Sequence, residues 1–77
     1  MNYKDILKFL DAVPFVPFRI HITNGQTYFV PHRDFVWVEP NRLQVAKPSK
    51  ESGRFMERTE YVSLLHIVSI EPVPQAA

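Results

Sequence analysis

Three histidines, His21, His32 and His66, are the side chains of this sequence best suited to binding a transition metal or to moving a proton near neutral pH. Zinc ligands usually recur at short, regular intervals, as paired cysteines or as two histidines one helical turn apart. The spacing here matches neither pattern, and the sequence contains no cysteine. We therefore expect ordinary surface and turn histidines, with neither a metal nor another cofactor.

Other catalytic arrangements find no support in the sequence. A nucleophilic serine needs a neighbouring base and an acid that orients it, and no serine here stands in a nucleophile-elbow motif. Glu57 and Glu60 have Arg54 and Arg58 as close neighbours in the sequence, which predicts a solvated charge cluster. Two glycines are too few for a phosphate-binding loop. The sequence thus predicts a protein that is not an enzyme.

The polar residues of most interest lie on a predicted β-hairpin over residues 18–30. Apolar and polar side chains alternate from Phe18 to Thr23, which is the period of a strand with one buried and one exposed face. Asn24 and Gly25 tolerate positive φ, and β-branched and aromatic residues resume after them. We therefore expect a tight turn at this dipeptide.

Two registers are open to this hairpin. A two-residue turn would place Ile20 opposite Phe29, whereas a three-residue loop over 23–25, with Gly25 as a left-handed bulge residue, would place Ile20 opposite Tyr28. The second register also places Phe18 opposite Val30, so that two good core residues join the buried face. We expect the second register, which leaves Phe29 on the outer face.

That outer face would combine an aromatic ring with basic and polar groups, which is a reasonable surface for binding another protein. Trp37 lies on a predicted strand, 35–38, whose two faces are both apolar. A small barrel buries only one of these faces, so the other must meet the helix, a second subunit or a partner. The candidate interaction surface comprises Arg19, His21, Phe29, His32, Arg33 and Trp37.

Nucleic-acid binding is the alternative interpretation. Phe29 could stack on a base, and six cations could contact phosphates: Arg19, Arg33, Arg42, Lys47, Lys50 and Arg54. Against this, nine basic and eight acidic residues give a net charge of only +1. Most proteins that bind polyanions have an obvious basic excess.

The remaining elements follow from periodicity and from the prolines. Apolar residues recur at helical spacing over 2–13, where Asn2 can cap a helix and Pro14 would end it. Further strands are expected over 35–38, 43–46, 55–63 and 67–71, with a polar loop over 47–54 and a 3₁₀ turn over 64–66. We expect a single domain over 1–77 that consists of a helix (2–13), a small β-barrel (18–71) and a frayed tail (72–77).

The order of elements predicts an α+β fold, in which an N-terminal helix precedes a strongly bent, five-stranded antiparallel sheet or small barrel. Closing the sheet would protect its edges from aggregation. This architecture is similar to the Sm-like and Src-homology-3-like barrels. We expect the core to contain Ile6, Leu7, Leu10, Phe18, Ile20, Ile22, Val30, Phe35, Trp37, Leu43, Val45, Val62, Leu65, Ile67 and Ile70.

At a finer level, the stretches PFRIHITNG, VPHRDFVWV and VSLLHIVSIEP resemble a family of short bacterial proteins. No reaction is known for that family, so the resemblance implies no catalytic residue.

Length and composition give the last expectations. A core that 77 residues can build is marginal by itself, and without cysteine no disulfide can add stability, so self-association is expected. No apolar run approaches the roughly 20 residues that cross a bilayer, and the absence of cysteine suits a reducing compartment. The sequence therefore predicts a cytoplasmic, non-enzymatic interaction module with no membrane contact. It binds itself, through a strand edge or the outer hairpin face, or it binds another protein.

Overall fold

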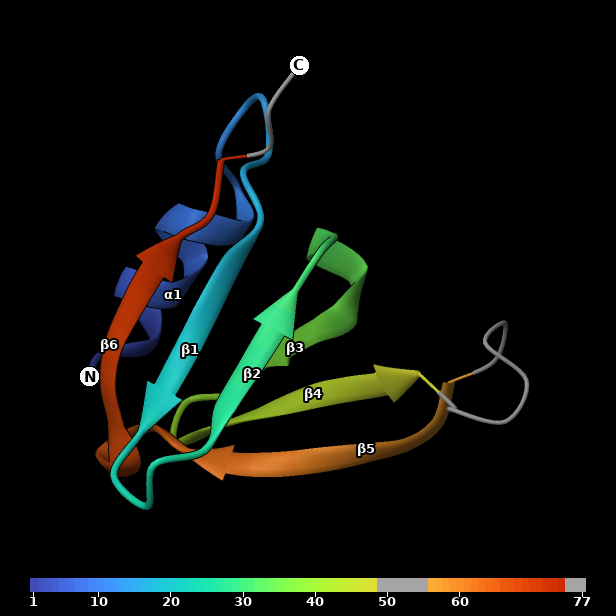
Figure 1. Cartoon of the computed structure of the whole chain (residues 1–77). Coiled ribbons are helices and arrows are strands. Elements are labelled where there is room, and N and C mark those ends of the chain that lie inside the picture. The colour runs from blue at the N-terminus through green and yellow to red at the C-terminus, as the bar shows by residue number, and fades with distance from the viewer. Residues whose placement is uncertain (49–55, 75–77) are drawn as a thin grey trace.

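The computed structural model describes residues 1–48 and 56–74, with the backbone alone described for residues 48 and 56–58. Figure 1 shows the chain. The elements, in order, are α1 (Tyr3–Leu10), β1 (Phe18–Ile22), β2 (Thr27–Val30), the 3₁₀ helix η1 (Arg33–Phe35), β3 (Val36–Val38), β4 (Arg42–Pro48), β5 (Met56–Ser63), the 3₁₀ helix η2 (Leu64–His66) and β6 (Ile67–Pro72).

The helix α1 begins where the sequence predicts and ends earlier. The Asn2 side chain caps it by accepting a hydrogen bond from the Lys4 amide at 2.8 Å. Its last helical hydrogen bond runs from the Asp11 amide to the Leu7 carbonyl. Pro14 has no N–H to bond to Leu10 and disfavours helical backbone at Val13, so the chain leaves the helix before residue 13. Val13 is accordingly 89% exposed.

The hairpin of β1 and β2 has the register with the three-residue loop. Phe18 lies opposite Val30 and Ile20 lies opposite Tyr28. The Ile22 amide donates to the Gln26 carbonyl, and the Gly25 amide donates back to the Ile22 carbonyl. Gly25 has a φ of +88°, in the left-handed region that residues other than glycine rarely adopt. The predicted register and bulge are confirmed.

The strands form two antiparallel sheets of three, in the orders β2-β1-β6 and β3-β4-β5. The α+β class is therefore confirmed, but the prediction of a five-stranded sheet or closed barrel is wrong for the part of the chain that is described. η1 and η2 each separate two consecutive strands and redirect the chain, so β2 does not pair with β3 and β5 does not pair with β6. In Figure 1, β4 and β5 run across the direction of β1 and β2.

Two expected core residues are exposed instead. Trp37 is 52% exposed and Leu65 is 86% exposed, while their preceding neighbours Val36 and Leu64 are buried. Val36 lies opposite the buried Val45, so Trp37 must point to the other face of the sheet. In the 3₁₀ turn, residues three apart lie on one side, and Leu64 therefore shares the inner side with Ile67.

The buried core joins the helix to both sheets. Its members are Ile6, Leu10, Phe18, Ile20, Tyr28, Val30, Val36, Leu43, Val45, Val62, Leu64 and Ile67. Tyr28 was not among the expected core residues, although the predicted register places it on the buried face.

The loop and tail boundaries also differ from those expected. Lys47 and Pro48 belong to β4, and the rest of the predicted polar loop, apart from these two residues, lies outside the described residues. β6 continues to Pro72, and the Val73 amide donates to the Pro17 carbonyl at 2.7 Å. These two residues are held by β1 and its preceding connector, although the sequence placed them in a frayed tail. Residues 75–77 lie outside the described range.

Candidate functional site

The six residues of the predicted interaction surface lie in three separate places. Arg19, His21 and Phe29 lie on the outer face of the β2-β1-β6 sheet. His32 and Arg33 lie at η1, and Trp37 lies on β3 in the other sheet. The sequence therefore predicted one coherent group of three side chains and added three others that do not join it.

The first place, which we call the hairpin face, consists of Arg19, His21, Thr27, Phe29 and Glu71. His21 Nε2 lies 3.0 Å from Glu71 Oε1, and an Arg19 guanidinium nitrogen lies 3.8 Å from the same oxygen. His21 Nδ1 is 3.3 Å from the Thr27 hydroxyl, and Arg19 lies over the Phe29 ring at 5.9 Å from its centroid. The basic groups of this face are thus already paired with a carboxylate.

Glu71 is the member of the hairpin face that the sequence did not reveal. It lies directly opposite Arg19 because β6 pairs with β1. Strands this far apart in the sequence carry no local pattern that predicts their pairing. The opposite charges of Arg19 and Glu71 were the one indication that the two residues could lie together.

At η1 the polar side chains hold the fold together. Arg33 Nη2 donates to the Ala12 carbonyl at 3.0 Å, and its guanidinium lies 5.6 Å from the Phe15 ring centroid. The rings of His32 and Phe35 are 5.9 Å apart. Arg33 therefore links η1 to the connector that follows α1, which is a structural role.

The outer side of the β3-β4-β5 sheet carries the largest exposed aromatic rings, and we call it the aromatic face. Its members are Trp37, Glu39, Arg42, Gln44 and Tyr61. Trp37 lies opposite Gln44, and Gln44 lies opposite Tyr61, so the three residues form one row across three strands. Trp37 and Tyr61 are 52% and 56% exposed. Neighbouring strands lie about 4.8 Å apart, which puts the two aromatic residues roughly 10 Å apart along the row.

Polar contacts hold this face in one arrangement. The Arg42 guanidinium lies 4.1 Å from the centroid of the Tyr61 ring, and its Nε donates to Glu39 Oε2 at 3.1 Å. Gln44 Nε2 donates to the same oxygen at 3.3 Å. The hydrogen bonds from Arg42 and Gln44 lower the pKa of the Glu39 carboxyl below its usual value, the bond from Arg42 having the larger effect. The face thus presents two rings beside one carboxylate and one guanidinium that offset each other.

The sequence identified Trp37 and Arg42 as candidates for different functions and did not include Tyr61 in either. Only the register of β4 against β3 and β5 brings the three together. Before that register is known, Tyr61 is one aromatic residue in a strand like any other.

The four described cations of the nucleic-acid hypothesis lie apart from one another. Arg19 is on the hairpin face, Arg33 at η1 and Arg42 on the aromatic face, while Lys47 Nζ lies 3.4 Å from Glu60 and 5.1 Å from the centroid of the Tyr28 ring. Three of the four have a carboxylate within 4.0 Å. Lys50 and Arg54 lie outside the described residues. The described cations do not form a common positive surface.

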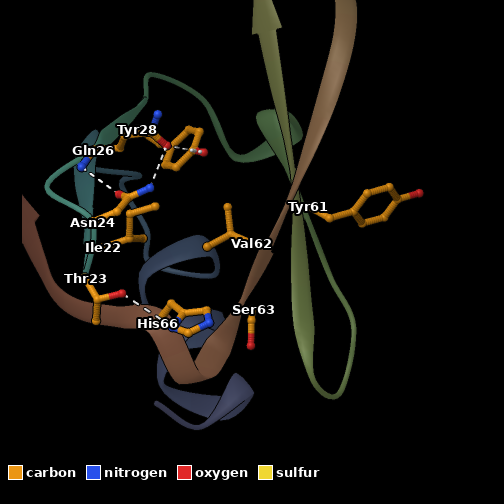
Figure 2. Close-up of a pocket in the computed structure, with 9 residues that line it drawn as sticks. All are labelled: Ile22, Thr23, Asn24, Gln26, Tyr28, Tyr61, Val62, Ser63 and His66. Atoms are coloured by element: carbon orange, nitrogen blue, oxygen red, sulfur yellow. Dashed lines mark hydrogen bonds between the residues drawn. The ribbon is translucent and has the colours of Figure 1, made fainter.

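A groove separates the hairpin turn from the end of β5 (Figure 2). It has a volume of about 360 Å³ and is lined by Ile22, Thr23, Asn24, Gln26, Tyr28, Tyr61, Val62, Ser63 and His66.

Hydrogen bonds organise the turn side of this groove. Asn24 Nδ2 donates to Gln26 Oε1 at 3.3 Å, and the Tyr28 hydroxyl donates to the same oxygen at 3.4 Å. The Asn24 side chain also accepts from the Gln26 amide, and Thr23 Oγ1 lies 3.4 Å from His66 Nδ1. Figure 2 shows the Tyr61 ring directed away from the other labelled side chains.

The three histidines occupy different surroundings. His21 contacts Glu71, His32 lies beside Phe35, and His66 contacts Thr23. Within residues 1–48 and 56–74, no three His, Cys, Asp or Glu side chains are grouped so that they could hold a metal ion. The same described ranges contain no helix with the length and hydropathy needed to span a bilayer.

No protein-family model, curated protein or solved structure matches this chain. The resemblance to a family of short bacterial proteins therefore stays a prediction, and the function has to be argued from the surfaces themselves.

Proposed function

We propose that this chain is a non-enzymatic interaction module that self-associates, with the aromatic face of one copy packed against the aromatic face of a second. The observation that carries the proposal is the half-exposed pair Trp37 and Tyr61, which lies on the side of the β3-β4-β5 sheet opposite the core. Tryptophan, tyrosine and arginine are the residues most enriched among those that dominate binding energy at protein interfaces. All three types are present on this one face.

The charges of the aromatic face favour a second copy as the partner. Glu39 and Arg42 leave the face without a net charge, so it offers little attraction to a polyanion or to a strongly basic protein. A two-fold axis that passes between Glu39 and Arg42 would bring each Arg42 near the Glu39 of the other copy, because a two-fold interface pairs the same patch with itself. The face is thus complementary to itself in charge and apolar in its two rings.

The structural order of the face supports the same proposal. Arg42 stacks on Tyr61 and is held by Glu39, so these side chains lose less conformational freedom when a partner covers them. The hairpin face, which was one of the two contact surfaces expected from the sequence, has its carboxylate at the centre of contacts with both Arg19 and His21. Burying the hairpin face would desolvate the Glu71 carboxylate together with both of its partners, whereas the aromatic face has the single ion pair of Glu39 and Arg42 to desolvate.

The test compares two aromatic residues on opposite sheets. Trp37→Ser removes the larger ring of the aromatic face, and Phe29→Ser, on the hairpin face, is the matched control because Phe29 is 45% exposed. We expect sedimentation equilibrium to show a wild-type dimer whose dissociation constant rises by at least about tenfold in Trp37→Ser, equivalent to about 1.4 kcal/mol. Phe29→Ser should dimerise as the wild type does.

Two results would overturn the proposal. One is a wild-type protein that stays monomeric up to about 1 mM, the weak end of measurable association. The other is a loss of dimer in Phe29→Ser as large as that in Trp37→Ser. Circular dichroism of both variants should match the wild type, since both rings are partly exposed in the monomer.

Nucleic-acid binding through an Sm-like assembly was the alternative function, and its support is weaker. It needs cations gathered on one surface, whereas the four described candidates lie on different parts of the molecule. A cytoplasmic location, inferred from the lack of cysteine, belongs to the proposal of a self-associating module.

A further inference from the structure

The strand β5 has one free edge along the groove. It is the last strand of the order β3-β4-β5, so within the described residues it is paired on one side alone, with β4. The main-chain groups on its other side form a template to which another extended chain could hydrogen-bond.

The hydrogen-bond pattern identifies which residues supply those groups. The Leu64 amide donates to the Asn41 carbonyl at 3.1 Å, which continues the register that sets Arg42 opposite Ser63. Hydrogen-bonded and non-hydrogen-bonded pairs alternate in an antiparallel ladder. Val62 is therefore bonded to β4, whereas the main-chain N–H and C=O groups of Thr59 and Tyr61 and the N–H of Ser63 point away from it. The Ser63 carbonyl belongs to the N-cap of η2 and accepts within that helix.

The pairing of β4 with β3 predicts the same alternation of hydrogen-bonded residues. The Glu39 amide donates to the Arg42 carbonyl at 2.9 Å, so the even-numbered residues of β4 bond to β3 and the odd-numbered ones bond to β5. Leu43 and Val45 are then the residues that bond to β5, in agreement with a free Tyr61 main chain.

The groove exposes this edge to a ligand. Tyr61 is one of its lining residues, yet its ring points away from the groove in Figure 2, so the main chain of Tyr61 is what it contributes. Val62 and Ile22 supply apolar surface to the lining, and Asn24 and Gln26 supply amide groups across from β5. A strand laid beside β5 would find main-chain partners on one side and side-chain amides on the other.

We propose that this groove binds an extended, uncharged segment of another protein, which adds to the free edge of β5 as a further strand. Among the described residues, no carboxylate, ammonium or guanidinium group lines the groove, so a charged segment would lose hydration without gaining a counter-ion from them. The β5 strand of a second copy, which contains Glu57, Arg58 and Glu60, is a poor match for that reason. Strand addition draws its affinity from main-chain hydrogen bonds and its selectivity from alternate side chains.

The probe is an acetylated and amidated peptide of sequence Thr-Val-Thr-Val-Thr, and its matched control is the same peptide methylated at every amide nitrogen. Both are titrated into the full chain, uniformly labelled with ¹⁵N. We expect the unmethylated peptide to shift the amide signals of Tyr61, Ser63, Asn24 and Gln26 and to slow hydrogen exchange at the Tyr61 and Ser63 amides at least tenfold. The methylated peptide should bind at least tenfold more weakly, because it has no N–H to donate.

Three results would overturn the inference. These are an absence of shifts at about 5 mM peptide, beyond the weak end of specific binding, equal binding of the two peptides, and shifts confined to other parts of the molecule. In the Trp37→Ser variant, which should not dimerise through the aromatic face, protection of the Tyr61 and Ser63 amides that grows with protein concentration alone would be a fourth such result, since a second copy would then occupy the edge.

This site can be tested separately from the proposed self-association, although Tyr61 belongs to both, with its main chain at the groove and its ring on the aromatic face. Trp37 does not line the groove, so the Trp37→Ser variant should bind the unmethylated peptide with an unchanged dissociation constant even where it no longer dimerises. A failure of dimerisation and a failure of strand addition are thereby observed in separate measurements.

Discussion

Tyr28 connects the two sheets at the level of a single side chain. It belongs to β2 and is only 7% exposed, while Lys47 of β4 lies over its ring and Glu60 of β5 acts on its hydroxyl. Burial raises the pKa of Tyr28 to about 12, and the hydrogen bond and the negative charge of Glu60 act in the same direction. Its hydroxyl therefore stays protonated in the folded protein at a pH where the unfolded chain has lost that proton.

This shift predicts a loss of stability in alkali. The folded state holds the proton more tightly, so the contribution is fully present below pH 10.0, the ordinary pKa, and is lost as the pH rises to about 12. The free energy of unfolding should fall by on the order of 2 kcal/mol over this interval because of Tyr28. Tyr28→Phe should remove that part of the fall, as measured by urea unfolding at several pH values.

The control for this experiment is Tyr61→Phe, which removes a hydroxyl from a ring that is 56% exposed. It should follow the wild-type dependence on pH. A Tyr28→Phe variant that loses stability in alkali as steeply as the wild type would contradict the assignment.

The sequence predicted which side chains share a surface only where those side chains are close together in the sequence. Arg19, His21 and Phe29 were correctly placed on one face, since a hairpin with a short loop fixes its own register. Glu71 and Tyr61 were missed, because their neighbours come from strands distant in sequence or from a register that no turn signal determines.

Among the elements, the two 3₁₀ helices decide which side chains of the following strands face inward. Each precedes a strand. After η1, Val36 is buried and Trp37 is exposed; within η2, Leu64 is buried and Leu65 is exposed. Alternation along a strand predicts only that adjacent residues face opposite ways. Which of the two is buried depends on the direction in which the preceding turn orients the first side chain.

Leu64 and Leu65 therefore provide a matched pair for measuring burial. Leu64 is 4% exposed and Leu65 is 86% exposed. Leu64→Ala should lower the free energy of unfolding by about 2–5 kcal/mol, because it removes buried methyl groups and leaves a cavity. Leu65→Ala should change it by less than about 0.5 kcal/mol.

Equilibrium unfolding in urea measures both variants under one condition. Equal losses in the two variants, or a larger loss in Leu65→Ala, would mean that η2 presents Leu65 to the interior. Ser63, whose hydroxyl accepts from the Leu65 amide, is left intact in both, so the cap of η2 is the same in each.

The elements themselves were largely predictable and their assembly was not. The helix start, the hairpin, the 3₁₀ turn at Leu64–His66 and the last strand all carry local signals in caps, turn residues and alternation. The separation into two sheets depends on η1, which the sequence indicated only as an interruption by Pro31 and its neighbours. A barrel was expected because closure removes exposed edges, but two open sheets packed around a shared core also bury their apolar faces, and they leave the edge of β5 unpaired within the described residues.

For the whole molecule, the distribution of charge argues against a nucleic-acid surface. The described cations face different directions, and most are paired with carboxylates. Only a few phosphates could be neutralised at once by one face, and affinity for a nucleic acid grows with that number.

We therefore expect a fluorescently labelled single-stranded RNA of 20 uridines to bind more weakly than about 100 µM at physiological salt, the weak limit of non-specific binding. Fluorescence anisotropy measures this directly. Replacing Arg19 and Arg33 together by alanine should leave the result unchanged, because the two residues lie on different surfaces. A dissociation constant near 1 µM that weakens in the double variant would restore the nucleic-acid hypothesis.

The pairing of β1 with β6 has a consequence for how the protein is made. Phe18 lies opposite Pro72, so the central strand of its sheet receives its second neighbour from residues translated more than fifty positions later. While a ribosome is still elongating the chain, β1 and β2 can form only a hairpin, and an isolated hairpin is marginally stable in water. The second edge of β1 stays unpaired until residues 67–72 leave the exit tunnel, and during this interval its main-chain groups are open to pairing with another extended chain.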